Sequence, residues 1–531
     1  MARGLAPVLV AGLTLTAFLP ALSNDFVRFD DHIGLLDNPA FRGFGREHLR
    51  WMWTSTTLAT YQPVVWMTWA LDYLVWGLDP RGYHLTNLVL HTASAVLVYG
   101  LTLRLLVAAH GKGSADESPG SRLGAAVAAL FFGIHPLRAE PVAWVSGRAD
   151  LVAGLFLLVS VLVYLEAWRR DATGGRAAGW LSAALGAFAV SLLAKPVGLA
   201  YPLVLVVLDV YPLRRLGRGA GGRRAPAAWR VWREKLPFAA LSLAIAPVTL
   251  LARARPGSWM EWQPLEGTAL AAYGLAFYLW KTFFLGPLSP LYERPMALNA
   301  LDGRFVVSAV AVLGITGLLV ARRARWPAAL AAWVSYVAML APRSEFVPFG
   351  SHIAADRYTY LPSLGWAVLV GACVREGWAR WRAGWVRPAA GTVAAALVVA
   401  SLAGLGALTW SQVQVWRDTK TLWTHVLSVD PASGVAHNNL GYILETEGRF
   451  AEAVAHYWRA TQARPGDSRP ALNLGRALVL RGRELGGQGQ FAEAVDHYRA
   501  ALRVRPGYRD AETELAAALR RLGDMPPARS P

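Results

Sequence analysis

The sequence predicts an all-α protein in two parts, a polytopic transmembrane helical part followed by a C-terminal array of paired helices. The first observation is composition, since 54% of the 531 residues are hydrophobic and only 17% are charged. The second is patterning, because long apolar runs fill the chain up to about residue 411 and amphipathic repeats follow. A membrane-spanning helix needs about 20 mostly apolar residues, so the first part predicts many spans.

The apolar runs predict 11 spans, with the N-terminus in the cytoplasm and the C-terminus outside. An odd number of runs falls between two basic loops, where alternation requires an even number, so either 236–252 or 269–286 is re-entrant or incomplete. Residues 61–77 are interrupted by Asp72 and are interpreted as an interfacial or re-entrant helix. The runs are 5–22, 85–108, 122–134, 150–168, 177–193, 197–212, 236–252, 269–286, 304–321, 326–342, 361–375 and 389–410.

Basic residues gather in the loops and set this orientation. The formal net charge of +18 is explained by arginine-rich loops on the cytoplasmic side, and no nucleic-acid motif accompanies it, so nucleic acid is not expected as a partner. Cleavage of a signal peptide near Ser23 stays an alternative to a retained first span. The predicted cytoplasmic loops are 169–176, 213–235, 322–325 and 375–387.

Residues after the last apolar run carry the pattern of a tetratricopeptide repeat. Small residues let the two helices of such a repeat pack closely, and proline ends the second helix. A second copy begins at Leu474, 34 residues after Leu440, and contains a seven-residue insertion before Phe491. The pattern residues of the first copy are Leu440, Gly441, Ala453, Tyr457, Ala460 and Pro465.

These features predict a membrane domain, a linker and a repeat domain. Two repeats with a cap are near the lower limit of a stable array. Repeats of this kind usually form protein-binding surfaces, and mere stability of the tail is the alternative. The predicted boundaries are 1–411 for the membrane domain, 412–433 for the linker or helix, and 434–525 for the repeat domain, with repeats at 434–467 and 468–508 and a capping helix at 509–523.

Four polar clusters flank the apolar runs on the predicted non-cytoplasmic side. Ionisable residues at the lipid boundary are costly, so they indicate function or pairing. Lys195, followed by Pro196, interrupts two apolar segments on the same side. The clusters are Asp30, Asp31 and His32; His84, Asn87 and His91; His135 to Glu140 with Ser146 to Asp150; and His352 with Asp356 to Tyr360.

Each cluster also has a purely structural interpretation. His84 and His91 can be core histidines, Arg148 can pair with Asp150, and Arg357 can pair with the aspartate before it. The sequence has no His-x-x-x-His pair and a single cysteine, so no metal site is predicted. Binding of Mg²⁺ or Mn²⁺ by the paired aspartates stays an alternative.

Together these stretches resemble the transmembrane and tetratricopeptide-repeat-containing family and its bacterial relatives. The order and spacing of the motifs carry the resemblance over nearly the whole chain, although this chain has only two recognisable repeats. The family resembles GT-C glycosyltransferases, which act on the non-cytoplasmic side with an acidic residue in the first external loop. The matching stretches are Phe26 to Asp31, Gly82 to His91, His135 to Asp150, Ala354 to Pro362 and the C-terminal repeats.

The resemblance implies an inverting transferase that moves a sugar, mannose or another hexose, from a polyprenyl-phosphate donor to a Ser or Thr hydroxyl of a protein. Asp30 or Asp31 is then the catalytic base, with the first slightly favoured. Arg148, Lys195 and Arg357 hold the donor phosphate, whose charge needs preorganised cations. No cofactor is expected. The supporting residues are His84, His91, His135, Glu140, Asp150 and Tyr358.

The composition, rich in Ala, Arg and Gly, is typical of a high-GC bacterial gene. We therefore expect an inner-membrane protein whose repeats lie in the periplasm and hold the protein acceptor. Two alternatives stay open. The chain is a non-catalytic scaffold whose repeats recruit a partner, or it transfers a lipid-linked sugar to envelope glycan or lipid.

Overall fold

The computed structural model describes residues 4–110, 118–172, 174–175, 177–216, 226–253, 263–296, 298–343 and 352–524. Residues 173, 176 and 217–225, which belong to two predicted cytoplasmic loops, lie outside the described residues. Within the described residues, the regular secondary structure is helical apart from one pair of short strands. The all-α prediction, with membrane-length helices followed by helical repeats, is confirmed.

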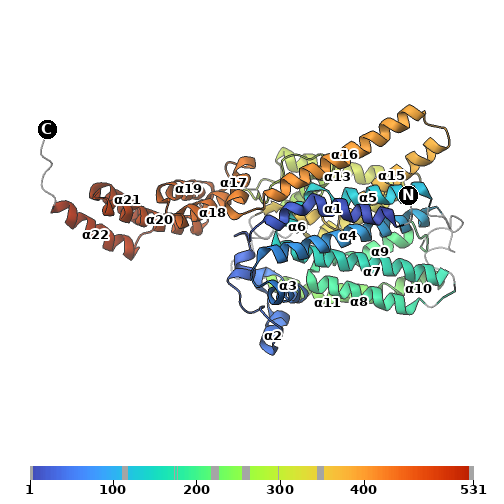
Figure 1. Ribbon diagram of the computed structural model, residues 1–531, viewed down its shortest axis with the longest axis horizontal. Helices are drawn as coiled ribbons and strands as arrows, with labels where there is room; N and C mark the ends of the chain where they lie inside the picture. Colours follow the sequence, from blue (N-terminus) through green and yellow to red (C-terminus); the bar gives the residue numbers. More distant parts are fainter. Residues whose placement is uncertain are drawn as a thin grey trace. The chain divides into compact units, whose positions relative to one another are not determined.

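The chain forms two compact units, and the boundary between them falls between Asp418 and Thr419. The first unit contains helices α1 to α16, which Figure 1 shows largely as long rods lying side by side. Their bounds are α1 Leu5–Phe18, α2 Arg46–Thr54, α3 Pro63–Trp76, α4 Pro80–Ala109, α5 Pro119–Gly133, α6 Ala139–Ala143, α7 Arg148–Ala172, α8 Ala178–Ala194, α9 Tyr201–Val210, α10 Pro226–Arg233, α11 Leu236–Arg253, α12 Pro264–Phe283, α13 Gly303–Ala321, α14 Pro327–Leu340, α15 Leu364–Arg382 and α16 Pro388–Gln414. Strands β1 (Tyr292–Glu293) and β2 (His352–Ala354) pair with each other.

Six helical segments of the described chain are long and apolar enough to cross a membrane, and a bent pair makes a seventh. The protein is therefore a multi-pass membrane protein, but the predicted count of 11 spans is not confirmed. The runs 177–193 and 197–212 correspond to the shorter helices α8 and α9, which have 17 and 10 residues. The long segments are Leu5–Ser23, Pro80–Ala109, Val145–Ala172, Ala228–Arg253, Gly303–Ala321 and Pro388–Gln414, and the bent pair is Pro119–Gly133 with Pro136–Ala143.

Two proline-induced breaks shape the end of the first unit where the polar clusters meet. A residue before proline is driven out of the helical region by a clash with the proline ring. His135 precedes Pro136 and is extended (φ −79°, ψ 133°), which separates α5 from α6 at an angle of 53°. Lys195 precedes Pro196 and is extended (φ −164°, ψ 129°), which separates α8 from α9. Both breaks turn the backbone next to polar residues of the predicted site.

Helices α5 and α15 approach so closely that only glycine fits at their contact. A Cβ atom on Gly124 would collide with the backbone carbonyl of Gly371, and one on Gly371 would lie 2.6 Å from the carbonyl oxygen of Gly124. Small residues permit close packing of helices in membranes. This contact fixes α15 and the loop before it, which carries part of the candidate site.

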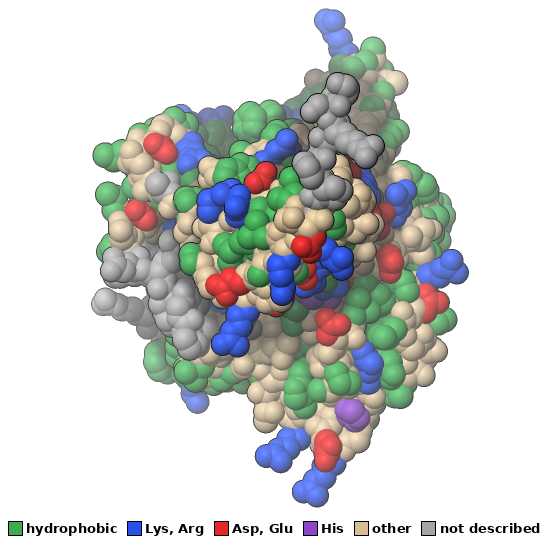
Figure 2. Space-filling model, turned by 90° about the vertical axis from the view of Figure 1, so that its left-hand side faces the viewer, with side chains coloured by type: hydrophobic (Ala, Val, Ile, Leu, Met, Phe, Trp, Pro, Cys, Tyr) green, Lys and Arg blue, Asp and Glu red, His purple; other side chains and the backbone are tan. Residues whose placement is uncertain are grey.

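The second unit consists of stacked helix pairs, as the repeat pattern predicts (Figure 1). The seven-residue insertion lengthens the first helix of the second repeat, which has 20 residues against 13 in the first. In Figure 2, which looks onto the end of the molecule at the left of Figure 1, basic and acidic side chains are interspersed with apolar and neutral ones. The helices are α17 Thr419–Val429, α18 Gly434–Thr446, α19 Phe450–Ala463, α20 Ser468–Gly487, α21 Phe491–Val504 and α22 Arg509–Gly523.

A short segment that begins at Glu293 also belongs to the second unit. The Glu293 carboxylate accepts hydrogen bonds from the Ser433 hydroxyl (2.6 Å) and the Val435 backbone N–H (3.1 Å), and pairs with Arg464 (2.6 Å). A carboxylate at the start of a helix complements its dipole and its unsatisfied N–H groups. Glu293 therefore stabilises the first turn of α18.

We predict that Gly441→Ala destabilises the repeat unit by about 1–3 kcal/mol, because the added methyl overpacks a tight contact. A Cβ atom there would lie 2.9 Å from two ring carbons of Tyr457. The matched control is Gly486→Ala on α20, where a Cβ atom would meet nothing within 4 Å, and where alanine favours the helix. Thermal unfolding and limited proteolysis of the full chain measure both effects. Equal stability of the two variants would contradict the packing described.

Candidate active site

One short segment, from Glu140 to Asp150, connects the four polar clusters predicted from the sequence. It begins in α6, passes through the short helical turn Val145–Gly147 and ends in the first turn of α7. The segment is largely buried, including its charged side chains. Side chains from distant parts of the chain bond to it.

The paired aspartates have different environments, although they are neighbours in sequence. Asp31 is fully buried, and its carboxylate accepts hydrogen bonds from the Val27 N–H (3.0 Å), the Ser146 N–H (3.0 Å) and the Ser146 hydroxyl (2.5 Å). Burial raises the pKa of Asp31 to about 7, against the lowering effect of these hydrogen bonds. Asp30 is partly exposed. Ser146 thus anchors the aspartate loop to the central segment.

Asp150 gathers two cations at the start of α7. Its buried carboxylate accepts from Lys195 Nζ (2.7 Å) and is also ion-paired with Arg343. Burial lowers the pKa of Lys195 to about 8, although the charge of Asp150 opposes this shift. Arg343 was not among the predicted residues. One sequence feature could have identified it. Arg343 follows Pro342 at the end of an apolar run, much as Lys195 stands before Pro196 at the end of another.

Arg357 connects the third and fourth clusters. Its guanidinium is ion-paired with Glu140, and its backbone N–H donates to the same carboxylate (2.7 Å). The guanidinium also lies 5.5 Å from the ring centroid of Trp144, which packs edge-on against Phe29 at 5.1 Å. Phe29 precedes Asp30, so the aspartate loop and Arg357 both contact one buried tryptophan.

Tyr358 and Asp356 complete the fourth cluster. The Tyr358 hydroxyl is hydrogen-bonded to His352 Nε2 (2.9 Å), and its ring lies 4.7 Å from the Arg343 guanidinium. Asp356 accepts a hydrogen bond from the Tyr292 hydroxyl (3.0 Å) rather than pairing with its neighbour in sequence. Burial and, secondly, the charge of a nearby glutamate raise the pKa of Asp356 to about 8.

Arg148 is positioned for structure rather than for a ligand, which corrects its predicted role in phosphate binding. Its side chain is completely buried and ion-paired with Asp72. It also donates to the Asn87 side-chain oxygen (2.7 Å) and to the Tyr83 carbonyl (2.7 Å). A phosphate cannot reach a guanidinium that is fully enclosed by these partners. This pairing has no local sequence pattern, because Asp72 lies in a different helix, α3.

The predicted supporting histidines have the character of core residues. His91 is buried and bonds to the Tyr360 hydroxyl (3.0 Å) and to a backbone carbonyl. His135 is buried and bonds to the Thr282 carbonyl (3.0 Å), while its other ring nitrogen accepts from a backbone N–H at the helix break. His84 is also fully buried in α4. Hydrogen bonding to the backbone explains His91 and His135 without a direct catalytic role.

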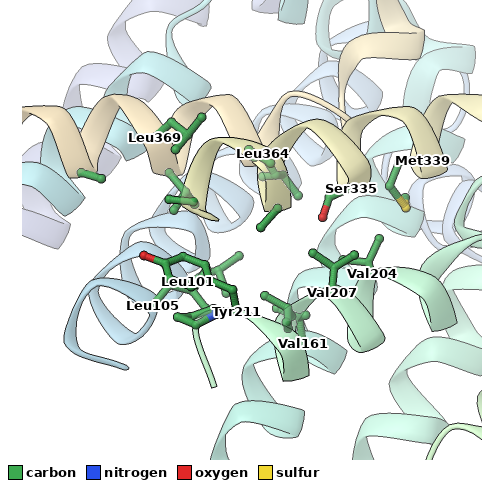
Figure 3. A pocket seen from close by; sticks show the side chains of 18 of the residues that line it. Leu101, Leu105, Val161, Val204, Val207, Tyr211, Ser335, Met339, Leu364 and Leu369 are labelled. Atoms are coloured by element: carbon green, nitrogen blue, oxygen red, sulfur yellow. The ribbon is translucent and has the colours of Figure 1, made fainter. Parts of the chain in front are cut away.

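A large apolar cavity adjoins the basic cluster. It has a volume of about 180 Å³, and Figure 3 shows side chains of α14 and α15 facing those of α4, α7 and α9 across it. Met339, Leu361 and Pro362 line both this cavity and a much smaller one bordered by Asp150, Arg343 and Arg357. The residues labelled in Figure 3 are Leu101, Leu105, Val161, Val204, Val207, Tyr211, Ser335, Met339, Leu364 and Leu369.

The cluster therefore combines three cations, two carboxylates and an adjoining hydrophobic space. Lys195, Arg343 and Arg357 face Asp150 and Glu140, which leaves one positive charge in excess. Such a site suits an anionic headgroup attached to a long apolar chain. Within the described residues, no group of three or more His, Cys, Asp and Glu side chains is arranged to hold a metal ion.

Comparison with known proteins confirms the family resemblance. The chain is 25% identical to Protein O-mannosyl-transferase Tmtc3 of Drosophila melanogaster over 78% of its own length and 50% of that protein. It is 25% identical to Protein O-mannosyl-transferase TMTC1 of Homo sapiens over 89% of its length and 57% of that protein. The chain thus spans about half the length of the curated relatives that it matches.

Two further matches concern the repeats and the solved structures. The tetratricopeptide repeat family matches residues 418–468 and 479–530. Among solved structures, ArnT from Cupriavidus metallidurans bound to undecaprenyl phosphate is 17% identical, covering 98% of this chain and 78% of that chain, with a TM-score of 0.35. At this TM-score the structural match adds nothing to the geometry described above.

We predict that the stability of the folded chain depends on pH through Asp31. Because burial raises its pKa from 3.8 to about 7, the folded chain favours the protonated carboxyl. This contribution to stability is fully present below about pH 4 and is lost as the pH rises through about 7. Ser146→Ala removes a hydrogen bond that lowers the pKa, so the loss moves to higher pH, whereas Ser146→Thr retains the hydroxyl as the control. Thermal unfolding across this pH range is the measurement, and identical profiles for Ser146→Ala and the native chain would contradict the assignment.

Proposed function

We propose that the protein is a membrane glycosyltransferase that moves a hexose, most simply mannose, from a polyprenyl-phosphate donor to a Ser or Thr hydroxyl of a protein. The observation that carries the proposal is the basic cluster that borders an apolar cavity, beside an aspartate loop held by the same segment. The similarity to proteins named protein O-mannosyl-transferases supports the reaction type.

The donor phosphate is assigned to Lys195, Arg343 and Arg357. Arginine offers a planar fork and lysine a point charge, and both are suited to phosphate oxygens. Removing the charged headgroup from water is offset by the excess positive charge of the cluster. The polyprenyl chain is assigned to the apolar cavity, because its lining is continuous with that of the cluster through Met339 and Leu361.

Asp30 is assigned as the general base and Asp31 as the residue that positions it. A base must reach the acceptor hydroxyl, and Asp30 is partly exposed whereas the oxygens of Asp31 are enclosed by Ser146 and Val27. In the reaction, Asp30 takes the hydroxyl proton as the oxygen attacks the sugar C1. The bond between C1 and the phosphate oxygen breaks, the configuration at C1 inverts, and polyprenyl phosphate leaves with the bonding electron pair.

The basic cluster acts most strongly on the leaving phosphate. Negative charge develops there as the glycosidic bond breaks, and cations already in position stabilise it without further reorganisation. The proposal assigns this charge neutralisation to side chains and includes no metal ion or cofactor. Glu140 and Asp150 hold the cations in place, since each is bonded to one or two of them.

The proposed location is a bacterial inner membrane, with the N-terminus in the cytoplasm and the repeats in the periplasm. Basic loops that favour the cytoplasmic side support this orientation. The proposed task of the repeats is to hold a polypeptide acceptor, because tetratricopeptide arrays present extended surfaces for peptides. The repeats carry exposed side chains of both charges, such as Arg469 and Asp496, which favours an acceptor recognised by several kinds of contact rather than by charge alone.

We predict that Asp30→Asn lowers sugar transfer by about 10²- to 10⁴-fold, because the variant loses its general base. Transfer is measured in membranes with labelled polyprenyl-phosphate mannose and a Ser/Thr peptide. Asp37→Asn is the matched control, since it alters an exposed acid of the same loop. Undiminished transfer by Asp30→Asn would refute the assigned base.

If the native chain does not transfer mannose, the assay is repeated with other polyprenyl-phosphate sugars and with other acceptors. Transfer to envelope lipid or glycan instead of peptide would replace the proposed acceptor. Absence of transfer with every donor, combined with specific capture of a partner by the repeats, would favour the scaffold interpretation.

We predict that the rate of sugar transfer falls as the pH rises through about 8, because Lys195 loses its proton. Burial lowers its pKa to about 8, so the ammonium that binds the phosphate is lost above that pH. Lys195→Arg keeps a cation at all these pH values, and the fall should move to higher pH when each profile is normalised to its own maximum. Arg304→Gln, which changes an exposed charge beside Asp302, is the control and should leave the profile unchanged. An unaltered fall in Lys195→Arg would contradict the role of Lys195.

A further inference from the structure

A second groove lies on the first unit, between α4, α7 and α8. It has a volume of about 420 Å³, and residues of the C-terminal half of α7 border it, away from the site at the start of that helix. Five of its lining side chains are apolar or aromatic and two are charged. The lining residues are Leu97, Arg104, Val159, Leu162, Val163, Glu166 and Trp180.

Arg104 is the unusual member of this groove. It lies in α4, one of the membrane-length helices, and its side chain is exposed. Within the described part of the chain, its polar contact is a hydrogen bond from Nη1 to the Leu162 backbone carbonyl (2.9 Å). A charge within a membrane span is costly unless it finds a partner of opposite charge or reaches the interface. Arg104 thus carries a charge that the described protein does not neutralise.

The rim of the groove is also basic. Glu166, the acid that lines it, is already bonded to two cations, Arg169 (2.6 Å) and Arg170 (2.9 Å). The charge of Glu166 is therefore engaged by these two arginines rather than by Arg104. Trp180 lies at the same rim, with the Arg170 guanidinium 5.8 Å from its ring centroid. Tryptophan beside arginine is typical of the level of lipid headgroups.

We infer that this groove is a binding site for an anionic phospholipid. The phosphate accepts hydrogen bonds from the free face of the Arg104 guanidinium, whose planar fork suits phosphate oxygens. One acyl chain lies along Leu97, Val159 and Val163, which form the apolar wall. A lipid without net charge fits the wall equally well but leaves the charge of Arg104 uncompensated. This site is independent of the proposed transfer reaction.

The test uses the full chain, purified in mild detergent and titrated with phosphatidylglycerol, with bound lipid counted by native mass spectrometry. The native chain should bind phosphatidylglycerol at least about tenfold more tightly than phosphatidylcholine, since a charged hydrogen-bonded contact is at stake. Arg104→Gln should remove most of this preference. Arg323→Gln is the matched control. Arg323 is an exposed arginine that also donates to a backbone carbonyl (Val320, 3.0 Å), but it borders neither this groove nor the apolar cavity of the candidate active site.

A second variant tests the groove without changing its charge. Val159→Trp fills the apolar wall, so phosphatidylglycerol binding should fall although Arg104 is intact. Arg104→Lys, which keeps the positive charge, should retain part of the preference and shows that the helix tolerates substitution. Equal binding of both lipids by the native chain would overturn the inference. An equal loss in Arg323→Gln and Arg104→Gln would overturn it too, because binding would then follow surface charge in general.

Discussion

The segment from Glu140 to Asp150 is the element on which the arrangement of the site depends. It binds Arg357 through Glu140, the aspartate loop through Ser146, and both Lys195 and Arg343 through Asp150. These ion pairs are largely buried, and removing one partner of a buried pair typically costs about 3–5 kcal/mol, because the other charge is left without compensation. Each contact therefore holds a separate helix or loop in place around one stretch of backbone.

The same ion pairs explain how the site can be stable when no substrate is bound and still attract an anion. Two carboxylates neutralise most of the charge of three cations, which keeps the cluster folded, and one positive charge remains. Low-dielectric surroundings strengthen such interactions, since charges in the apolar region are poorly screened by water. The apolar cavity lined by Met339, Leu361 and their neighbours supplies these surroundings, and its largely apolar lining suits a hydrocarbon chain better than a free sugar.

The sequence predicted the fold class and the repeats well, because both depend on local patterns. Gly441 packs against Tyr457 as the repeat spacing requires, and the insertion appears as a longer helix. The polar clusters also converge, with Glu140 beside Arg357 and Lys195 beside Asp150. What the sequence could not supply was pairing over long distances.

Two particular failures show this limit. Arg148 pairs with Asp72 from another helix, and neither residue carries a local signal of that contact. Arg343 was missed because a single arginine after an apolar run resembles an ordinary loop charge. The predicted count of 11 spans stays a prediction, because hydropathy does not tell whether a short apolar helix such as α9, with 10 residues, crosses the membrane.

The most direct test of the assigned donor site is an experimental structure of the full chain in a lipid nanodisc with a polyprenyl phosphate bound. The account predicts that the phosphate lies within hydrogen-bonding distance, about 3 Å, of at least two of Lys195, Arg343 and Arg357. It also predicts that isoprene units fill the cavity between α14, α15 and α9. A phosphate bound away from these three cations, or a cavity that stays empty while lipid is bound elsewhere, would contradict the account.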